Sequence, residues 1–254
     1  MPRLTRVLSV SVRTALRPRA YVRVSGPDAE GYLQRMLSND VTQGEIVDAL
    51  LLTPKSRLIA PLRVWRRGPD DFLLLTEPAL GEVVRSTLLR ARFSSKCEIE
   101  LEEHRSALLF GEAEGWPGEL PGSVEVIDAE VQPTLEAEDL ERVRIEAGVP
   151  AWGKELDEAI LPAEAGLDQT HISFTRGCYP GQEPIARLHH RGKVNRRLRV
   201  LEVESANPGD PIVSDGKTVG RVTSAVPGIA LGYVRVEVPD DAGLSIDGAP
   251  ARLH

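Results

Sequence analysis

The sequence predicts an α+β fold in which antiparallel sheets carry helices, followed by a small C-terminal β-barrel. Strand-like segments occur in pairs separated by turns, which is typical of antiparallel sheets. Two segments among these strands have apolar residues at helical spacing, so helices can cover one face of a sheet. From Arg197 onward, short strands divided by turns indicate a barrel.

The first predicted strand covers residues 20–24, where apolar and polar residues alternate. Pro27 and Asp28 suit a helix start, and the helix should end at Ser38-Asn39-Asp40, because these residues prefer turns. The apolar face of this helix is formed by Ala29, Leu33, Met36 and Leu37, with Tyr32 beside them.

Further strand pairs follow. A hairpin is predicted around Pro54-Lys55-Ser56, and a second turn is predicted at Gly68-Pro69-Asp70-Asp71. The expected strands are 49–52, 58–65, 72–75, 97–101 and 107–110. A helix is expected between strands 72–75 and 97–101, and its apolar face carries Leu80, Val83, Val84, Leu88 and Leu89.

The middle of the chain has fewer regular elements. Residues 115–122 are rich in Gly and Pro and predict a loop, and a short strand is expected at 124–127. A helix over 135–147 should stop at Gly148. Residues 148–166 are expected to be mostly irregular.

The barrel strands are expected at 198–203, 211–213, 218–223, 229–238 and 244–246. We therefore expect two domains, residues 1–195 and residues 196–254.

Composition excludes several classes of function. The net charge of −7 argues against general nucleic-acid affinity. The two cysteines, Cys97 and Cys178, make no disulfide framework, which fits a reducing compartment. The chain has no C-x-x-C pair for holding a metal cluster itself, so we expect no metal site. No apolar run approaches the ~18 residues of a membrane span.

The N-terminus is basic, with Arg3, Arg6 and further arginines before the first acidic residue, Asp28. That composition is typical of a transit peptide. The early strand at 20–24 instead favours a folded, cytoplasmic protein.

The most informative segment is Phe174-Thr175-Arg176-Gly177-Cys178-Tyr179-Pro180-Gly181-Gln182-Glu183. If a helix starts near Gln182, Cys178 sits just ahead of its positive end, and Arg176 adds a second positive charge. Both effects favour the thiolate and lower a cysteine pKa. The alternative is a small buried apolar cysteine in a tight turn.

This segment resembles the Lys-Gly-Cys-Tyr-x-Gly-Gln-Glu signature of the YgfZ-type folate-binding proteins, which are relatives of the glycine-cleavage T-protein (aminomethyltransferase). The resemblance implies a T-protein-like folate-binding fold, tetrahydrofolate or a derivative as ligand, and a role in iron–sulfur cluster assembly or repair. The matching positions are Arg176 (for Lys), Gly177, Cys178, Tyr179, Gly181, Gln182 and Glu183.

Two further stretches extend the resemblance. Residues 33–41, ending in Ser38-Asn39-Asp40-Val41, are similar to the T-protein segment that ends in the active-site aspartate, which makes Asp40 a catalytic and folate-binding candidate. The local alternative is a turn residue. Arg144 matches a folate-associated arginine, whereas the alternative is a surface arginine with a helical partner. Trp152 can stack on a pterin or fill the core.

A basic run follows the signature, and it can attract a polyglutamate tail or an acidic or RNA partner, or form a solvated surface stretch. Its members are Arg187, His189, His190, Arg191, Lys193, Arg196, Arg197 and Arg199.

The chain also departs from true T-proteins. They are longer, and their Gly-Tyr-Thr-Gly-Glu segment has no counterpart between Leu108 and Val131. The resemblance therefore favours a folate-binding factor that serves iron–sulfur client or assembly proteins, with Cys178 as its working thiol. The alternative is a one-carbon transferase that uses Asp40. A scaffold that has lost its ligand is also open.

Overall fold

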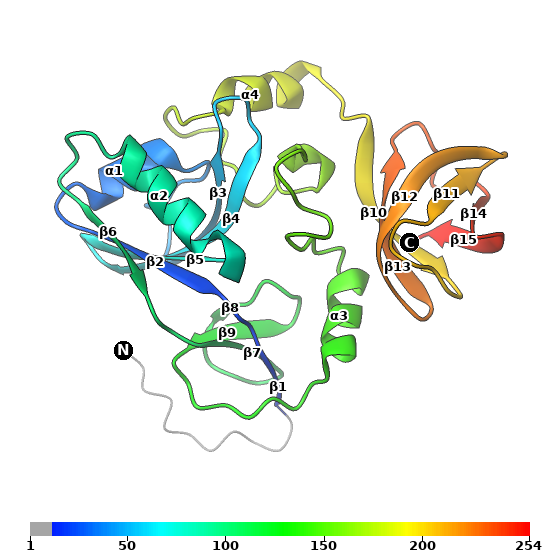
Figure 1. The fold of residues 1–254 in the computed structure, drawn as a ribbon, viewed down its shortest axis with the longest axis horizontal. Coiled ribbons are helices and arrows are strands. Elements are labelled where there is room, and N and C mark those ends of the chain that lie inside the picture. The colour runs from blue at the N-terminus through cyan, green and yellow to red at the C-terminus, as the bar shows by residue number, and fades with distance from the viewer. Residues whose placement is uncertain (1–11) are drawn as a thin grey trace.

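The computed structural model describes residues 12–254, which form three parts around an irregular central segment (Figure 1). They are a five-stranded antiparallel sheet of order β3-β4-β5-β2-β6, a four-stranded antiparallel sheet of order β1-β7-β9-β8, and a closed six-stranded barrel. The predicted α+β fold with a C-terminal barrel is confirmed. Arg3 and Arg6 of the basic N-terminal segment lie outside the described residues.

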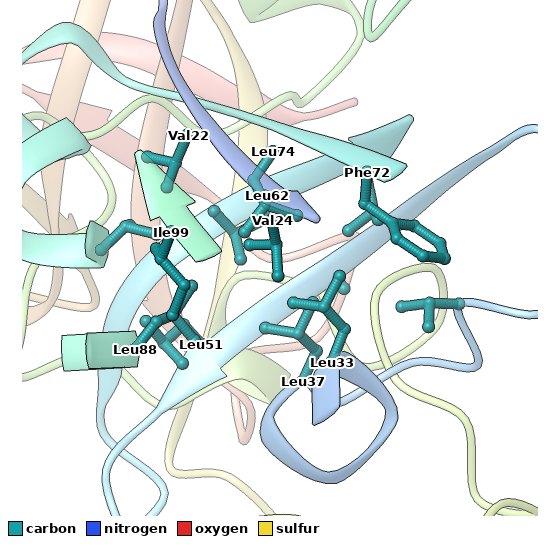
Figure 2. Packing of buried hydrophobic residues seen from close by; sticks show 14 of the residues in the cluster. Val22, Val24, Leu33, Leu37, Leu51, Leu62, Phe72, Leu74, Leu88 and Ile99 are labelled. Atoms are coloured by element: carbon teal, nitrogen blue, oxygen red, sulfur yellow. The ribbon is translucent and has the colours of Figure 1, made fainter. Parts of the chain in front are cut away.

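The five-stranded sheet is buried on both faces. Helices α1 (Ala29–Met36) and α2 (Gly81–Ala91) cover one face, where Leu33 of α1 and Leu88 of α2 pack with Val24 of the sheet (Figure 2). On the other face Tyr21 and Leu75 pack with residues that include Ile127 of the four-stranded sheet. The strands are β2 (Ala20–Ser25), β3 (Ile46–Leu52), β4 (Leu58–Gly68), β5 (Asp71–Thr76) and β6 (Glu98–Glu102), and a 3-10 turn, Pro78–Leu80, precedes α2.

The four-stranded sheet contains two strands that the sequence did not predict. β1 (Arg13–Leu16) pairs antiparallel with β7 (Ser106–Phe110), and its inward residues are the small Thr14 and Ala15, which give little hydrophobic signal. The two-residue β8 (Trp116–Pro117) lies inside the predicted loop and pairs with β9 (Ser123–Ile127).

The barrel closes through pairing of β10 with β15, so that none of its strands is left as an open edge. The sequence prediction missed β15, and the predicted strand 229–238 ends early, at Arg235. The strands are β10 (Arg196–Val203), β11 (Pro211–Ser214), β12 (Lys217–Val226), β13 (Ile229–Arg235), β14 (Leu244–Ile246) and β15 (Ala249–Leu253).

Helix α3 (Ala137–Glu146) lies between the four-stranded sheet and the barrel (Figure 1). Leu140 packs against a cluster that contains Phe110, whereas Ile145 packs against Leu231 of the barrel. Between α3 and α4 (Gln182–Arg191) the chain is irregular apart from the 3-10 turn Pro162–Glu164, and this includes residues 148–166, for which it was predicted. No helix in residues 12–254 is long and apolar enough to cross a membrane. The division into domains 1–195 and 196–254 stays a prediction.

Candidate functional site

The end of α1 and the segment before the cysteine signature, which are far apart in sequence, are joined by hydrogen bonds. The Ser173 backbone N–H donates to the Ser38 carbonyl at 3.1 Å, and the Ser38 hydroxyl donates to the His171 carbonyl at 2.6 Å. The same hydroxyl accepts from the Leu50 N–H of β3 at 2.8 Å. Fully buried Ser38 therefore fixes both segments to the five-stranded sheet.

Asn39 and Arg176 strengthen this joint. The Asn39 side-chain amide donates to the carbonyls of Asp48 (2.8 Å) and Thr170 (3.1 Å). The Arg176 guanidinium donates to the carbonyls of Asn39 (2.5 Å) and Leu37. We call the contacts of residues 37–39 with residues 170–176 the motif joint. It brings together the cysteine signature and the stretch 33–41, two of the three stretches that carried the sequence resemblance.

Cys178 is exposed, while the residues that follow it are firmly held. Tyr179 is buried, and the Gly181 carbonyl accepts from the buried Ser56 hydroxyl at 2.5 Å. Gly181 has φ +84°, and a Cβ there would lie 2.5 Å from the Thr53 carbonyl oxygen. The turn between β3 and β4 therefore clamps the loop, and the thiol projects from a fixed support. The exposed position differs from the buried alternative considered for this cysteine.

The remaining signature residues shape the start of α4, which begins at Gln182 as predicted. The Gln182 side-chain carbonyl accepts from the Tyr179 N–H at 3.4 Å. Glu183 is exposed and forms a loose surface ion pair with Arg187 at 3.8 Å, which contributes little to stability. Gly177 is exposed and has open space where a Cβ would lie.

Arg176 points to the end of α1, and its guanidinium lies 5.2 Å from the centre of the Tyr179 ring. Burial lowers the pKa of Arg176, against the opposing effect of Asp40. Its Nε and Nη2 are buried and make no hydrogen bond with residues 12–254. Its clearest structural role is to hold the motif joint.

Both carboxylate oxygens of Asp40 are hydrogen-bonded to residues close to it in sequence. One carboxylate oxygen accepts from the Thr42 hydroxyl (2.6 Å), the Thr42 N–H (3.0 Å) and the Gln34 amide (3.0 Å), and the other accepts from the Gln43 amide (3.0 Å). The Thr42 hydroxyl contributes most to lowering the pKa of Asp40. This geometry matches the local turn alternative. The catalytic and folate-binding roles of Asp40 stay predictions.

Arg144 is buried with every N–H group engaged. It bonds to the carboxylate of Glu141 (2.9 and 2.7 Å), to Glu155 (2.8 Å), to the Val149 carbonyl (2.6 Å) and to the Ser224 hydroxyl (2.7 Å). Because Ser224 belongs to β12, this network connects α3 and the central segment to the barrel. Arg144 has no N–H left for an external carboxylate here, so its folate-binding role stays a prediction. Half-buried Trp152 packs against two hydrophobic clusters, and stacking on a pterin likewise stays a prediction.

A cavity of 720 Å³ lies where the five-stranded sheet, the central segment and β10 meet. We call it the central cavity. Neither Cys178, Asp40, Arg144 nor Trp152 is among its lining residues. Its polar wall instead contains residues that the sequence reasoning missed: Arg19, Asp48, Arg63, Glu77, Glu119, Asp168 and His171. The available signals were Arg63, a charged residue inside the predicted strand 58–65, and Asp48, a carboxylate directly before the predicted strand 49–52.

Ion pairs organise this wall. Glu119 pairs with Arg17 and Arg19, while the fully buried Glu125 pairs with Arg19 (2.5 Å) and Arg63. Burial would raise the pKa of Glu119, but the guanidinium groups of Arg19 and Arg17 outweigh it and lower the pKa from 4.5 to about 2. The wall is therefore charged and rigid at neutral pH.

Two groups of the wall keep hydrogen-bonding capacity. Asp48 accepts from Arg63 through one oxygen (3.0 Å), and its second oxygen has no partner within the described residues. His171 contacts the Thr170 hydroxyl through Nδ1 (2.7 Å), and its Nε2 has no partner within that same range. Burial lowers the pKa of His171, which keeps the ring neutral near pH 7. An acceptor and a neutral imidazole thus face a ligand-sized space.

Comparison with known proteins gives a consistent result. Residues 195–254 match the family described as the CAF17 C-terminal beta-barrel domain. The crystal structure of the glycine cleavage system aminomethyltransferase T from Bartonella henselae shares the fold, with a TM-score of 0.76 at 17% identity over 96% of this chain and 85% of that chain.

Two curated relatives extend the likeness. The mitochondrial iron–sulfur cluster assembly factor IBA57 homologue of Pyricularia oryzae is 24% identical over 94% of this chain and 75% of its own length. The tRNA-modifying protein YgfZ of Edwardsiella ictaluri is 28% identical over 70% of this chain and 66% of its own length. These matches fit a YgfZ-type relative of the T-protein, and the family resemblance read from the cysteine signature is confirmed. No comparison tests the roles of individual residues in this chain.

We predict that Gly181→Ala destabilises the fold by about 1–3 kcal/mol, because alanine resists a positive φ and its Cβ would meet the Thr53 carbonyl. Gly177→Ala is the matched control and should change stability by less than about 0.5 kcal/mol, since its Cβ meets open space. Urea unfolding measures both. Equal effects of the two variants would contradict the clamp.

We predict that Arg144→Met lowers the free energy of unfolding by about 3–5 kcal/mol, because it leaves the carboxylate of Glu155 buried without its partner. Arg142→Met, two residues away on the same helix, removes a 3.9 Å surface pair with Glu146 and an exposed hydrogen bond to the Pro227 carbonyl, and should cost only about 1 kcal/mol. Both are measured by urea unfolding. A small effect of Arg144→Met would show that the network does not hold the barrel.

We predict a pH dependence from Glu119. Its folded pKa lies below its unfolded value, so its stabilising effect is present above about pH 4.5 and is lost as the pH falls toward 2. Glu119→Gln should reduce the slope of unfolding free energy against pH in this window, without abolishing it, because Glu102 and Glu141 also have pKa values of about 2. The exposed Glu112→Gln is the control, and an unchanged slope in Glu119→Gln would refute the assignment.

Proposed function

We propose that this protein binds tetrahydrofolate or a derivative and acts in iron–sulfur cluster assembly or repair of client enzymes, with Cys178 as its working thiol. The observation that carries the proposal is the combination of an exposed cysteine on a clamped loop with a separate ligand-sized cavity. The relative named as an iron–sulfur cluster assembly factor matches most of the chain and supports the iron–sulfur half of the proposal.

The central cavity fits a reduced pterin in size and chemistry. Ligand pockets usually span about 300–1,000 Å³, and this one has 720 Å³. The open oxygen of Asp48 can accept from pterin N–H groups, and His171 Nε2 can exchange a hydrogen bond with a ring nitrogen or carbonyl. When bound, the folate would supply a reduced ring that carries or accepts one-carbon groups.

In this proposal the sequence-predicted residues act mainly as supports. Arg144 holds the carbonyl of Val149, which lines the cavity, and Asn39 holds the backbone of Asp48 and Thr170, which also line it. Asp40 fixes the turn that follows Asn39. Trp152 packs between two clusters beside these segments.

An exposed thiol on a fixed loop suits contact with a cluster or with a partner protein, because the thiolate is the metal ligand and the nucleophile of cysteine. The partners would therefore be iron–sulfur client or assembly proteins. A one-carbon transferase would instead need Asp40 for chemistry, and the hydrogen bonds to both its oxygens argue against a role as base. A cytoplasmic location stays a prediction.

Anaerobic calorimetric titration with tetrahydrofolate tests the ligand. We expect saturable binding to the wild-type protein, about tenfold weaker in Asp48→Asn because a charged acceptor is lost. Asp241→Asn, an exposed barrel aspartate, is the control and should bind normally. Absence of binding at millimolar ligand would reject the folate half of the proposal.

Complementation tests the thiol. In cells that lack the gene, Cys178→Ala should fail to restore the activity of iron–sulfur enzymes, although the purified variant folds and binds tetrahydrofolate. Cys97→Ala, which changes the buried cysteine, should restore activity. Full rescue by Cys178→Ala would reject Cys178 as the working residue.

A further inference from the structure

Arg197 occupies a position that no other described residue shares. Besides the central cavity, it lines a side cavity of 680 Å³ beside α4 and a rim cavity of 340 Å³ beside the end of β13. It is the one residue common to the linings of all three. The three cavities therefore border the start of β10, where Arg197 lies beside the central cavity.

The charge of Arg197 is uncompensated, unlike the charges beside it. Arg196 pairs with Glu164 at 3.2 Å and lies over the Tyr233 ring, and Arg199 pairs with Asp240 at 2.8 Å. Arg197 is exposed and makes no ion pair or side-chain hydrogen bond with residues 12–254. Two of three neighbouring arginines thus have internal structural partners, while the third faces the junction without one.

Lys193 is a second cation beside these cavities. Lys193 lines both the side cavity and the rim cavity, is exposed, and makes no ion pair within the described part of the chain. Arg187 lines the side cavity as well, held only by its loose pair with Glu183. Of the acids that line these three cavities, Asp168 alone makes no ion pair within the described residues. Cations therefore outnumber free carboxylates around the side and rim cavities.

We propose that Arg197 and Lys193 bind an anionic tail of more than one carboxylate on the ligand of the central cavity. The proposal rests on the proposed function, because the ring of that ligand would lie in the central cavity. A guanidinium binds a carboxylate through two parallel N–H donors, and an ammonium acts as a point charge that tolerates a flexible tail. Arg197 would bind the carboxylate next to the cavity, and Lys193 would bind a later one.

The test compares three probes by anaerobic calorimetry: tetrahydropterin, which lacks a tail, tetrahydrofolate with one glutamate, and tetrahydrofolate with three γ-linked glutamates. Each exposed ion pair is worth up to about fivefold in affinity. We expect the wild-type protein to bind the triglutamate form most tightly. Its preference over the monoglutamate form should shrink as salt is added, because exposed charges are screened.

The variants assign this preference to residues. Lys193→Gln should weaken the triglutamate form more than the monoglutamate form, and Arg197→Gln should weaken both tailed forms by up to about fivefold while leaving tetrahydropterin unchanged. Arg197→Glu should weaken the triglutamate form further. Arg221→Gln is the matched control, because this exposed barrel arginine lines none of the three cavities. Unchanged thermal unfolding of each variant would show that the barrel is intact.

Equal wild-type affinity for the two tailed forms would overturn the proposal, as would an equal loss for all three probes in Arg197→Gln. The first result would instead favour an acidic partner protein as the ligand of Arg197 and Lys193. Binding of tetrahydropterin without tail preference would thus reject the tail site while keeping the central cavity as a folate site. Failure of all three probes to bind would reject both.

Discussion

The motif joint is the contact on which the remaining site geometry depends. Ser38 has one hydroxyl, and it donates to the His171 carbonyl while accepting from the Leu50 N–H. Asn39 similarly connects the backbone of Asp48 to that of Thr170. A buried polar group that is fully satisfied fixes one arrangement, since any other leaves it unpaired. The wall of the central cavity and the support of Cys178 therefore share one anchor.

A second set of buried charges attaches the barrel. Arg144 connects α3, the central segment and β12, and Glu155 accepts from both Arg144 and Ser224 (2.6 Å). Such an ion pair adds little net stability over apolar packing, but breaking it is costly, so it specifies a single docking geometry. Because Arg197 stands on β10, that geometry also decides where its guanidinium meets the central cavity.

Patterns with a strong local cause were predictable from the sequence. Alternation predicted β2, helical spacing predicted α1 and α2, and the Pro-Gly, Asp-Gly and Pro-Asp turns predicted most of the barrel. β1 was not predicted, because it is short and pairs only with β7, which is distant in sequence. β15 was not predicted, because its buried residue is the small Ala251 and Pro250 interrupts the strand pattern. The signature also identified the cysteine loop, since Gly181 must adopt a positive φ.

The residues that line the central cavity could not be predicted in the same way. Asp48, Glu119 and His171 lie on three separate segments, and each looks like an ordinary polar residue in its own sequence context. Only the tertiary structure brings them to one wall. The sequence equally could not show that Arg144 uses all its donors internally, because Ser224 lies in another part of the fold.

The clamp on Gly181 has a consequence for association. A flexible loop that becomes ordered on binding loses conformational entropy, and that loss subtracts from affinity. The loop that carries Cys178 is already ordered on its C-terminal side, where the Gly181 backbone rests against the turn between β3 and β4. A partner that meets this thiol would therefore find its approach direction set in advance, so even a small contact area could support a brief but specific encounter.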